Sequence, residues 1–283
     1  LGDPATVVAL PVNSVRTTMI NNGPVAENQL DTVRALDQIT ISGEVTDLNG
    51  LLLDDFNGLI YPTVYDKPQT IPLLQQDPGS SAYDVEVQRN IVFRGRATVT
   101  NGQFTFTFVV PRDINYEFGQ GKISYYAADP STRRDAAGSY AGLVIGGTNE
   151  NAVADDLGPQ VDVFMNDFSF VTGGEVESEA TLLVRLEDDL GINVTGNSIG
   201  HDLEAVLDED TRNAIVLNDY YEADPDNFRA GEVRFPLFDL EPGLHTVSVR
   251  AWDVANNSAT GSTEFLVAAN GREGLTRVLN YPN

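Results

Sequence analysis

The chain of 283 residues contains no cysteine, and it has only two histidines and one tryptophan. Without cysteine, the chain forms no disulfide and holds no metal through thiolates. A cysteine nucleophile is excluded for the same reason. Any chemistry in this chain must therefore come from oxygen and nitrogen groups.

Basic residues are also scarce, since 17 lysines and arginines stand against 42 aspartates and glutamates and leave a net charge of −25. A charge of this sign repels nucleic acid and anionic lipid. It suits a solvated surface, surroundings rich in Ca²⁺ or salt, or a basic partner. We therefore expect no nucleic-acid partner.

Long apolar runs are missing as well. No stretch of 18 apolar residues exists, so we expect no membrane-spanning segment. The opening residues LGDP lack the pattern of a signal peptide and are typical of the interior of a longer chain, so we expect this sequence to be part of one.

Short alternating segments fill the chain and predict an all-β fold of two tandem Ig-like β-sandwich domains. The clearest is a hairpin in which residues 91–100 and 104–110 flank Asn101 and Gly102, a pair suited to a type I′ turn. Phe104, Phe106 and Phe108 share one face of it, which we expect to face the core. Few and short helices are expected, because no stretch keeps a 3.6-residue apolar period.

The expected division places a first β-sandwich at residues 1–157, with the tail of an upstream peptidase domain at 1–10. The second Ig-like sandwich takes residues 158–270, after a polar linker at 146–159, and residues 271–283 lead toward a missing C-terminal domain. Within the first domain we predict a short strand at 6–11, a helical turn at 33–36 and a loop at 67–83. Pro62 cannot donate a ladder hydrogen bond, so its strand is expected at an edge or a bulge.

The pair His201 and Asp202 is the most suggestive of catalysis, because a histidine oriented by a carboxylate can act as a general base or a metal ligand. No G-x-S-x-G elbow accompanies it, and His245 lies in a separate strand. We therefore expect no catalytic, cofactor-binding or metal-binding residue. His201 is interpreted instead as capping the glycine turn at 196–200, or bonding to backbone at the start of the next strand.

Acidic pairs and triplets recur along the chain, and Ca²⁺ takes six to eight oxygen ligands from such loops. The segment 224–227, with Asp219 nearby, has the right ligand types but lacks the spacing of an EF-hand. We interpret these clusters as a solvated acidic surface in preference to a Ca²⁺ site. Ca²⁺ stays open as a cofactor, and no ligand is assigned.

Residues 251–258 (AWDVANNS) are typical of a strand followed by the tight turn found in many bacterial Ig-like domains. Asn256 occupies the position where glycine is usual, and asparagine tolerates a positive φ there. Asp253 is expected to accept backbone N–H bonds across the turn. Trp252 is interpreted as packing in or near the core rather than stacking on a sugar.

An ordered set of segments resembles the gingipain-type cysteine endopeptidases that act as sortases of the type IX secretion system in Bacteroidota. These segments are FNGLIYPTVYDK (56–67), VFRGRATVTNGQFTFTFVVPRDI (92–114), GKISYYAAD (121–129), MNDFSFVTGG (165–174), GINVTGNSIGHDLEAVLD (191–208), IVLNDYYEADPDNFRAGEVRF (215–235) and LEPGLHTVSVRAWDVANNS (240–258). LGDPA at 1–5 resembles the close of a peptidase domain, and VLNYPN at 278–283 resembles the start of a type IX C-terminal domain.

The resemblance implies a non-catalytic piece between the peptidase and the C-terminal domain, with the family's catalytic cysteine and histidine upstream of it. The parent protein would be cell-surface and outer-membrane associated, and it would be held there by the β-barrel protein PorV and other proteins of the surface attachment complex. The alternative is an adhesin or glycan-binding module of another gingipain-like surface protein. An independent enzyme is the third reading, and the missing nucleophile argues against it.

Overall fold

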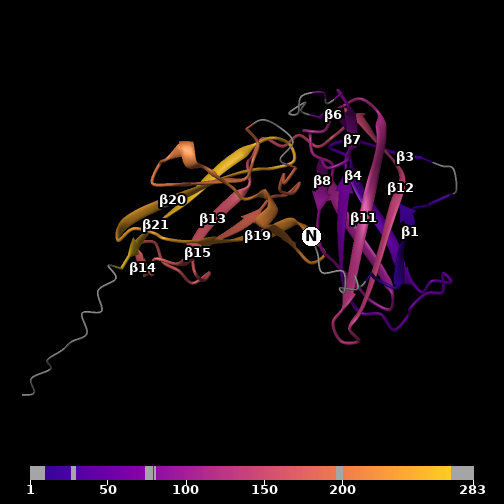
Figure 1. The fold of residues 1–283 in the computed structure, drawn as a ribbon, viewed down its shortest axis with the longest axis horizontal. Coiled ribbons are helices and arrows are strands. Elements are labelled where there is room, and N and C mark those ends of the chain that lie inside the picture. The colour runs from indigo at the N-terminus through magenta and orange to yellow at the C-terminus, as the bar shows by residue number, and fades with distance from the viewer. Residues whose placement is uncertain (1–9, 27–29, 74–78, 80, 196–199, 269–283) are drawn as a thin grey trace, which may run out of the picture.

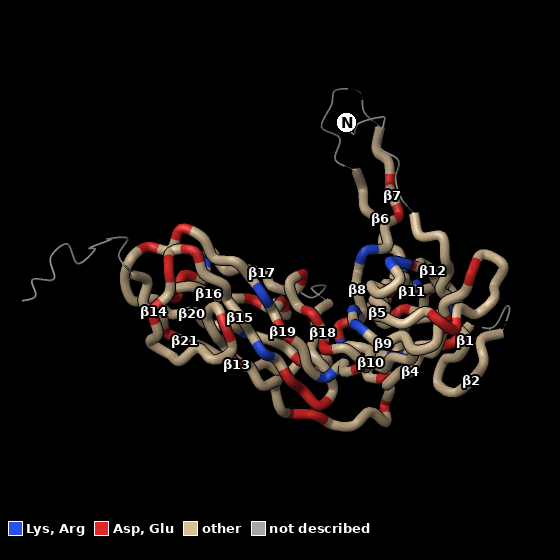
Figure 2. The backbone as a smooth tube through the Cα atoms, turned by 90° about the horizontal axis from the view of Figure 1, so that it is seen from below, with Lys and Arg blue, Asp and Glu red and all other residues tan. Residues whose placement is uncertain are grey.

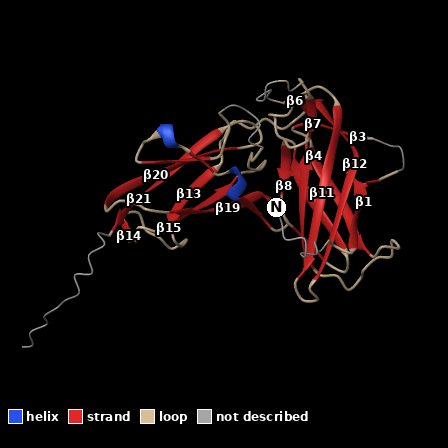
Figure 3. Cartoon of the chain, viewed as in Figure 1, coloured by secondary structure: helices blue, strands red, loops and turns tan. Residues whose placement is uncertain are grey.

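The structure is a computed structural model that describes residues 10–26, 30–73, 79, 81–195 and 200–268. Its regular elements are strands apart from two single-turn 3-10 helices, η1 (Thr211–Asn213) and η2 (Asn218–Tyr220) (Figures 1 and 3). The prediction of an all-β fold with few, short helices is confirmed. No helix in the described ranges has the length and apolar character needed to cross a membrane.

The first domain is one hydrogen-bonded sheet that wraps around a single core. Its strands are β1 (Asn13–Ile20), β2 (Gly23–Pro24), β3 (Asp31–Ala35), β4 (Gln38–Thr46), β5 (Gly58–Tyr65), β8 (Ile91–Arg94), β9 (Ala97–Val99), β10 (Gln103–Val109), β11 (Gly119–Asp129) and β12 (Arg134–Thr148). The order is β10-β4-β1-β12-β11-β5-β8, and β9 also pairs with β5. Because β9 turns directly into β10, the two ends of the sheet meet.

The predicted hairpin is confirmed in its turn but not in its pairing, because β9 pairs with β5 and β10 pairs with β4, and in the described chain a single bridge between Thr100 and Gln103 joins the two. Asn101 and Gly102 both have positive φ, at 52° and 73°, as a type I′ turn requires. Phe104, Phe106 and Phe108 are all buried in the core of the domain. The predicted face of this hairpin is confirmed.

The helical turn expected at residues 33–36 is wrong. Residues 33–35 belong to β3, which pairs in parallel with β12, and Leu36 lies in the turn that follows. Val33 and Ala35 are buried while Thr32 and Arg34 are exposed, which is the two-residue period of a strand. Its partner lies more than a hundred residues away, so a reading of local pattern could not reveal it.

Pro62 lies in a strand with neighbours on both sides rather than at an edge. On one side it pairs with Tyr125 of β11. On the other side β9 pairs with residues 58–60 of β5 and β8 with residues 63–65, so Pro62 falls at the interruption between them. Proline is tolerated here because the neighbouring strand is broken where a ladder bond would be needed.

The expected loop at residues 67–83 contains a strand. β6 (Gln69–Pro72) pairs with β7 (Asp84–Val87) as a separate two-stranded sheet, which projects from the domain in Figure 2. The strand predicted at residues 6–11 falls mostly outside the described residues. The expected segments at 1–5, 271–283 and 278–283 fall wholly outside them.

The second domain is an Ig-like sandwich of two sheets. Its strands are β13 (Gln160–Met165), β14 (Gly174–Val176), β15 (Ala180–Glu187), β16 (Glu204–Leu207), β17 (Ile215–Val216), β18 (Tyr221–Asp224), β19 (Asn227–Leu237), β20 (Gly243–Trp252) and β21 (Ser258–Val267). One sheet has the order β13-β15-β19-β18 and the other β14-β21-β20-β16-β17. Apolar side chains from both sheets fill the space between them.

The two sets of strands are separate in their pairing. Strands up to β12 pair with one another, and strands from β13 onward do likewise, with a single bridge between Arg96 and Pro225 joining the sets in the described chain. Each set has its own hydrophobic core. The functional question is therefore what holds the two domains against each other.

Candidate functional site

The junction between the domains is built where the β8–β9–β10 end of the first domain meets the β18–β19 end of the second (Figure 2). Phe93 and Phe108 of the first domain and Ile192 and Val254 of the second line a gap of only about 10 Å³. A gap this small means that the apolar side chains are in close contact. The junction is therefore packed as well as bonded.

A bulge between β8 and β9 turns the backbone toward the second domain. Gly95 is required there, because the Cζ atom of Phe93 would lie 2.3 Å from an added Cβ. Arg96 follows it, and its Nε donates to the carbonyl oxygen of Ala223 at 2.7 Å. The backbone N–H of Asp226 donates to the carbonyl oxygen of Arg96 at 3.0 Å.

The carboxylate of Asp226 completes this bonding. One oxygen accepts from the backbone N–H of Thr98 at 2.7 Å, and the other accepts from the Thr98 hydroxyl at 2.5 Å. Arg96 also pairs with Glu222 at 2.8 Å. Main-chain bonds thus fix the register of the two domains, and the ion pair adds to them at the rim.

A second set of bonds converges on Asp113, which lies in the loop after β10 and has a side chain only 6% exposed. Its Oδ2 accepts from Nδ1 of His201 at 2.7 Å and from Nδ2 of Asn193 at 3.0 Å. Its Oδ1 accepts from Nδ2 of Asn256 at 2.6 Å. One carboxylate of the first domain therefore binds three side chains from two loops of the second, the β15–β16 connection and the turn after β20.

His201 is thus a junction residue in this structure. Its hydrogen bond crosses to the other domain, and its ring lies 4.2 Å from that of Trp252. The glycine turn that His201 was expected to cap includes residues 196–199, which lie outside the described residues. No nucleophilic hydroxyl is bonded to His201 in the described chain.

Three carboxylates meet beside the junction, where the linker residue Asp155 lies against Asp188 and Asp253. Their oxygens all lie within 4.8 Å of one another. Burial raises the pKa of Asp188 to about 6. The hydrogen bond from the backbone N–H of Leu190 acts in the opposite direction and lowers this pKa, but burial has the larger effect. Burial also raises the pKa of Asp253. Among the described residues this is the group whose oxygens could hold a cation, and oxygen ligands suit Ca²⁺.

The carboxylates that the sequence suggested for Ca²⁺ do not converge. Asp224 forms a two-point ion pair with Arg185, and Asp226 is bonded to Thr98. Asp219 pairs with Arg94 at 3.4 Å. Sequence spacing missed the group at 155, 188 and 253, because its members come from three separate segments.

The turn at residues 253–257 has the predicted geometry and joins these features. Asn256 has a φ of 69°, and the backbone N–H of Asn257 donates to Asp253 at 2.7 Å. Nδ2 of Asn257 also bonds to the carbonyl oxygen of Asp155 at 2.9 Å. One turn of the second domain thus contacts both the linker and, through Asn256, the first domain.

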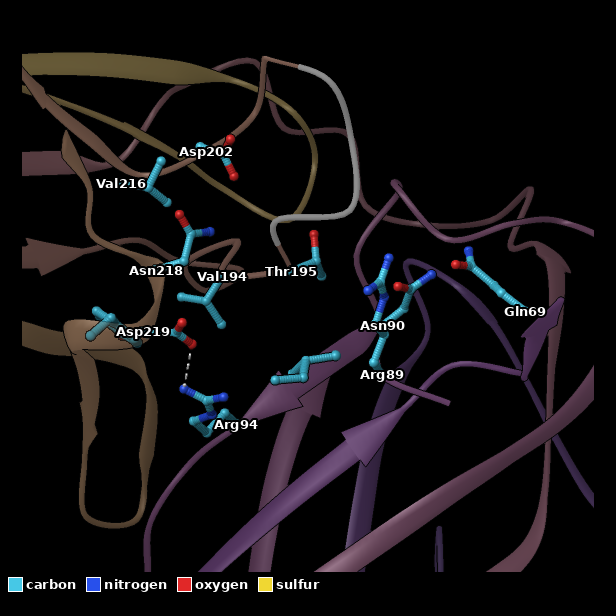
Figure 4. Close-up of a pocket in the computed structure, with 12 residues that line it drawn as sticks. Gln69, Arg89, Asn90, Arg94, Val194, Thr195, Asp202, Val216, Asn218 and Asp219 are labelled. Carbon is cyan, nitrogen blue, oxygen red and sulfur yellow. Dashed lines mark hydrogen bonds and ion pairs between the residues drawn. The ribbon is translucent and has the colours of Figure 1, made fainter. Parts of the chain in front are cut away.

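A cleft of about 490 Å³ opens beside these contacts, between the domains (Figure 4). Its first-domain wall includes Gln69, Arg89, Asn90, Ile91 and Arg94. Its second-domain wall includes Val194, Thr195, Asp202, Asn218, Asp219 and Tyr221. Sequence analysis singled out Asp202 and Asp219 for other roles and gave no signal for Arg89 or Arg94.

The second histidine, His245, lies at the end of the second domain that is away from the junction, and its contacts there are structural. Nδ1 of His245 bonds to Asp208 at 2.6 Å, and Nε2 bonds to the carbonyl oxygen of Glu241 at 2.7 Å. Burial lowers the pKa of His245, but these two oxygens raise it more. Both ring nitrogens are occupied, so this histidine fastens a loop to a strand.

Comparison with known proteins finds no matching family model and no matching curated protein. Among solved structures, dimeric latent PorU from Porphyromonas gingivalis is similar over 95% of this chain, with 29% identity and a TM-score of 0.56. This chain covers 25% of that PorU chain, so it spans about a quarter of its length. The similarity supports a fragment related to PorU.

Two further solved structures are less similar. The fibronectin(III)-like modules of CbhA from Clostridium thermocellum share 12% identity over 89% of this chain and 93% of theirs, with a TM-score of 0.24. The titin domains z1z2 share 12% identity over 92% of this chain and 98% of theirs, with the same TM-score. Scores this low support no argument about function.

Proposed function

We propose that this chain is the non-catalytic Ig-like segment of a cell-surface sortase of the type IX secretion system, and that it spaces and orients the peptidase while offering a surface to partners. The parent protein carries the cysteine endopeptidase activity outside this chain. It is associated with the outer membrane through PorV and other proteins of the attachment complex.

The observation that carries this proposal is the similarity to PorU over 95% of the chain. It spans both domains and therefore includes the junction as well as the two separate folds. A spacer that orients another domain needs a fixed angle between its own parts. The bonds of Arg96 to Ala223 and Asp226 and the bonds to Asp113 supply such a joint.

A replacement in the full-length parent protein tests the proposal. We expect that exchanging this segment for a flexible Gly/Ser linker of equal length abolishes processing of secreted cargo at the cell surface. Cleavage of a short soluble peptide by the same protein should persist, because the peptidase itself is unchanged. A flexible linker keeps the connection but loses the orientation.

Capture of the parent protein on immobilised PorV separates the two parts of the proposal. Reduced capture by the linker variant supports a contact surface in this segment. Unchanged capture contradicts the contact surface and leaves the spacer role as the part of the proposal that stands. Normal processing of cargo by the linker variant overturns the proposal. Turnover of a peptide or ester by the isolated chain contradicts its non-catalytic assignment.

A further inference from the structure

We propose that the cleft at the domain junction binds an extended peptide segment of another protein that carries one acidic and one basic side chain. The inference rests on the two walls of the cleft and does not depend on the proposed function. Its volume of about 490 Å³ lies within the roughly 300–1,000 Å³ common for binding pockets.

The first-domain wall presents basic and amide groups. Arg89 is exposed, and its guanidinium has no ion-pair or hydrogen-bond partner among the described residues. Asn90 follows it, and Figure 4 shows the two side chains beside each other on this wall, with Gln69 nearby. A guanidinium next to a primary amide matches a carboxylate, because both donate N–H groups to its two oxygens.

The second-domain wall presents acidic groups. The carboxylate of Asp202 faces the cleft from above (Figure 4), and it has no hydrogen bond or ion pair within the described part of the chain. Burial raises the pKa of Asp202, and Glu204 adds to this effect, so a cation near it would be favourable. A lysine or arginine side chain supplies that cation.

Other groups suit a peptide backbone between these two charges. Nδ2 of Asn218 is buried without an acceptor among the described residues, and Figure 4 shows it on the side of this side chain that faces Thr195, which belongs to the same wall. A buried amide donor without an acceptor is costly, and a small shift of this side chain would offer it to a peptide carbonyl. Val194 and the exposed Val216 add apolar contact area.

Other ligand classes fit the walls less well. A small anion near Arg89 would also face Asp202 and Asp219 across the cleft. A neutral sugar would leave Arg89 and Asp202 uncompensated, and it would find no open ring to stack on, because Tyr221 is the lining aromatic residue and is 5% exposed. A segment with charges of both signs is complementary to both walls.

The probes are acetylated, amidated hexapeptides with one glutamate and one lysine separated by one to three glycines, titrated into the whole chain by NMR. We expect at least one to shift resonances of Arg89, Asn90 and Asp202. Replacing its glutamate by glutamine, or its lysine by norleucine, should weaken binding about fivefold, the scale of one charge-assisted contact at an exposed site.

The variant Arg89→Gln tests the wall directly. This variant should bind the glutamate peptide about fivefold more weakly than the unaltered chain does. It should also bind the glutamate and glutamine peptides with equal affinity. Arg34→Gln is the matched control, since Arg34 is an exposed arginine of β3, on another part of the first domain. Its binding should equal that of the unaltered chain.

Asp202→Asn provides the second variant, and it should remove the preference for lysine over norleucine. The proposal is overturned if no peptide shifts the cleft resonances at 5 mM, a concentration beyond the weak end of ordinary peptide recognition. Equal binding of charged and neutral peptides, or shifts produced only by a neutral oligosaccharide such as maltohexaose, overturns it as well.

Discussion

The two domains close their cores in different ways. The first wraps one sheet around an aromatic cluster in which Phe93 stacks on Phe108 with centroids 4.7 Å apart, and its ends meet at the β9–β10 hairpin. The second faces two separate sheets across a largely aliphatic core, with Phe265 as a buried aromatic residue. The same class of fold thus tolerates either a continuous or a divided sheet.

The domains also differ in what they bring to the junction. The first contributes a bulge, one carboxylate and the edge of its aromatic core. The second contributes loops whose side chains are amides, an imidazole and carboxylates. The difference teaches that the position of the second domain depends on the polar side chains of its loops as well as on apolar contact with the first domain.

The largest expected effect breaks the first core alone. Phe104→Ala should lower the unfolding free energy of the first domain by about 3–5 kcal/mol, because it removes a buried ring that does not line the junction gap and leaves a cavity. The transition of the second domain should move little. Calorimetry resolves the two transitions, with Phe118→Ala as the control, since Phe118 is 61% exposed. Equal shifts of both transitions would show that the domains unfold as one unit.

The next effect breaks the junction and leaves both cores intact. Asp113→Ala should cost about 2–3 kcal/mol of the coupling between the domains, because Asn193, His201 and Asn256 lose their common acceptor. Small-angle scattering should show a wider range of domain angles.

Asp156→Ala is the control for the junction variant, since Asp156 is an exposed linker carboxylate. If Asp113→Ala leaves both the scattering and the unfolding unchanged, the packed apolar contact alone holds the domains together.

A third test concerns the carboxylates beside the junction. Asp188 has a folded-state pKa of about 6, above its unfolded value, so its charge destabilises the fold above pH 6. That cost disappears as the pH falls from 6 toward 4. Asp188→Asn should therefore stabilise the second domain by about 1–2 kcal/mol at pH 7.5, after allowance for solvent screening, and by nothing at pH 4.

Urea unfolding at the two pH values in the presence of EDTA measures this effect. Asp189→Asn is the matched control, because Asp189 is the exposed neighbour. If Asp188→Asn instead destabilises the protein, and does so only when Ca²⁺ is added, the three carboxylates hold a cation and their repulsion is not the dominant effect.

The smallest effects compare all the bonds of the Arg96 side chain with its ion pair alone. Arg96→Ala should cost about 1 kcal/mol, because it leaves the carbonyl oxygen of Ala223 without its donor and also removes the ion pair with Glu222. Glu222→Gln should cost less than about 0.5 kcal/mol, since that side chain is 65% exposed and its ion pair is screened. Equal costs in denaturant unfolding would contradict this ranking.

Much of the fold could be predicted because it depends on local pattern. Alternation placed β4 and β10, and Asn101 with Gly102 placed the turn between β9 and β10, although these two strands pair with β5 and β4 and not with each other. Tyr125 is buried and Tyr126 exposed, as the two-residue period requires. By contrast, β3 was read as helix because its parallel partner lies far along the chain.

The sequence by itself determined that this chain is all-β, acidic and without thiol chemistry, since composition and two-residue alternation act over a few neighbouring residues. Only the tertiary structure decided what its polar residues do. Asp113 meets Asn193, His201 and Asn256 across 80, 88 and 143 residues. Contacts between loops of two domains depend on how the domains pack, and no local spacing encodes that.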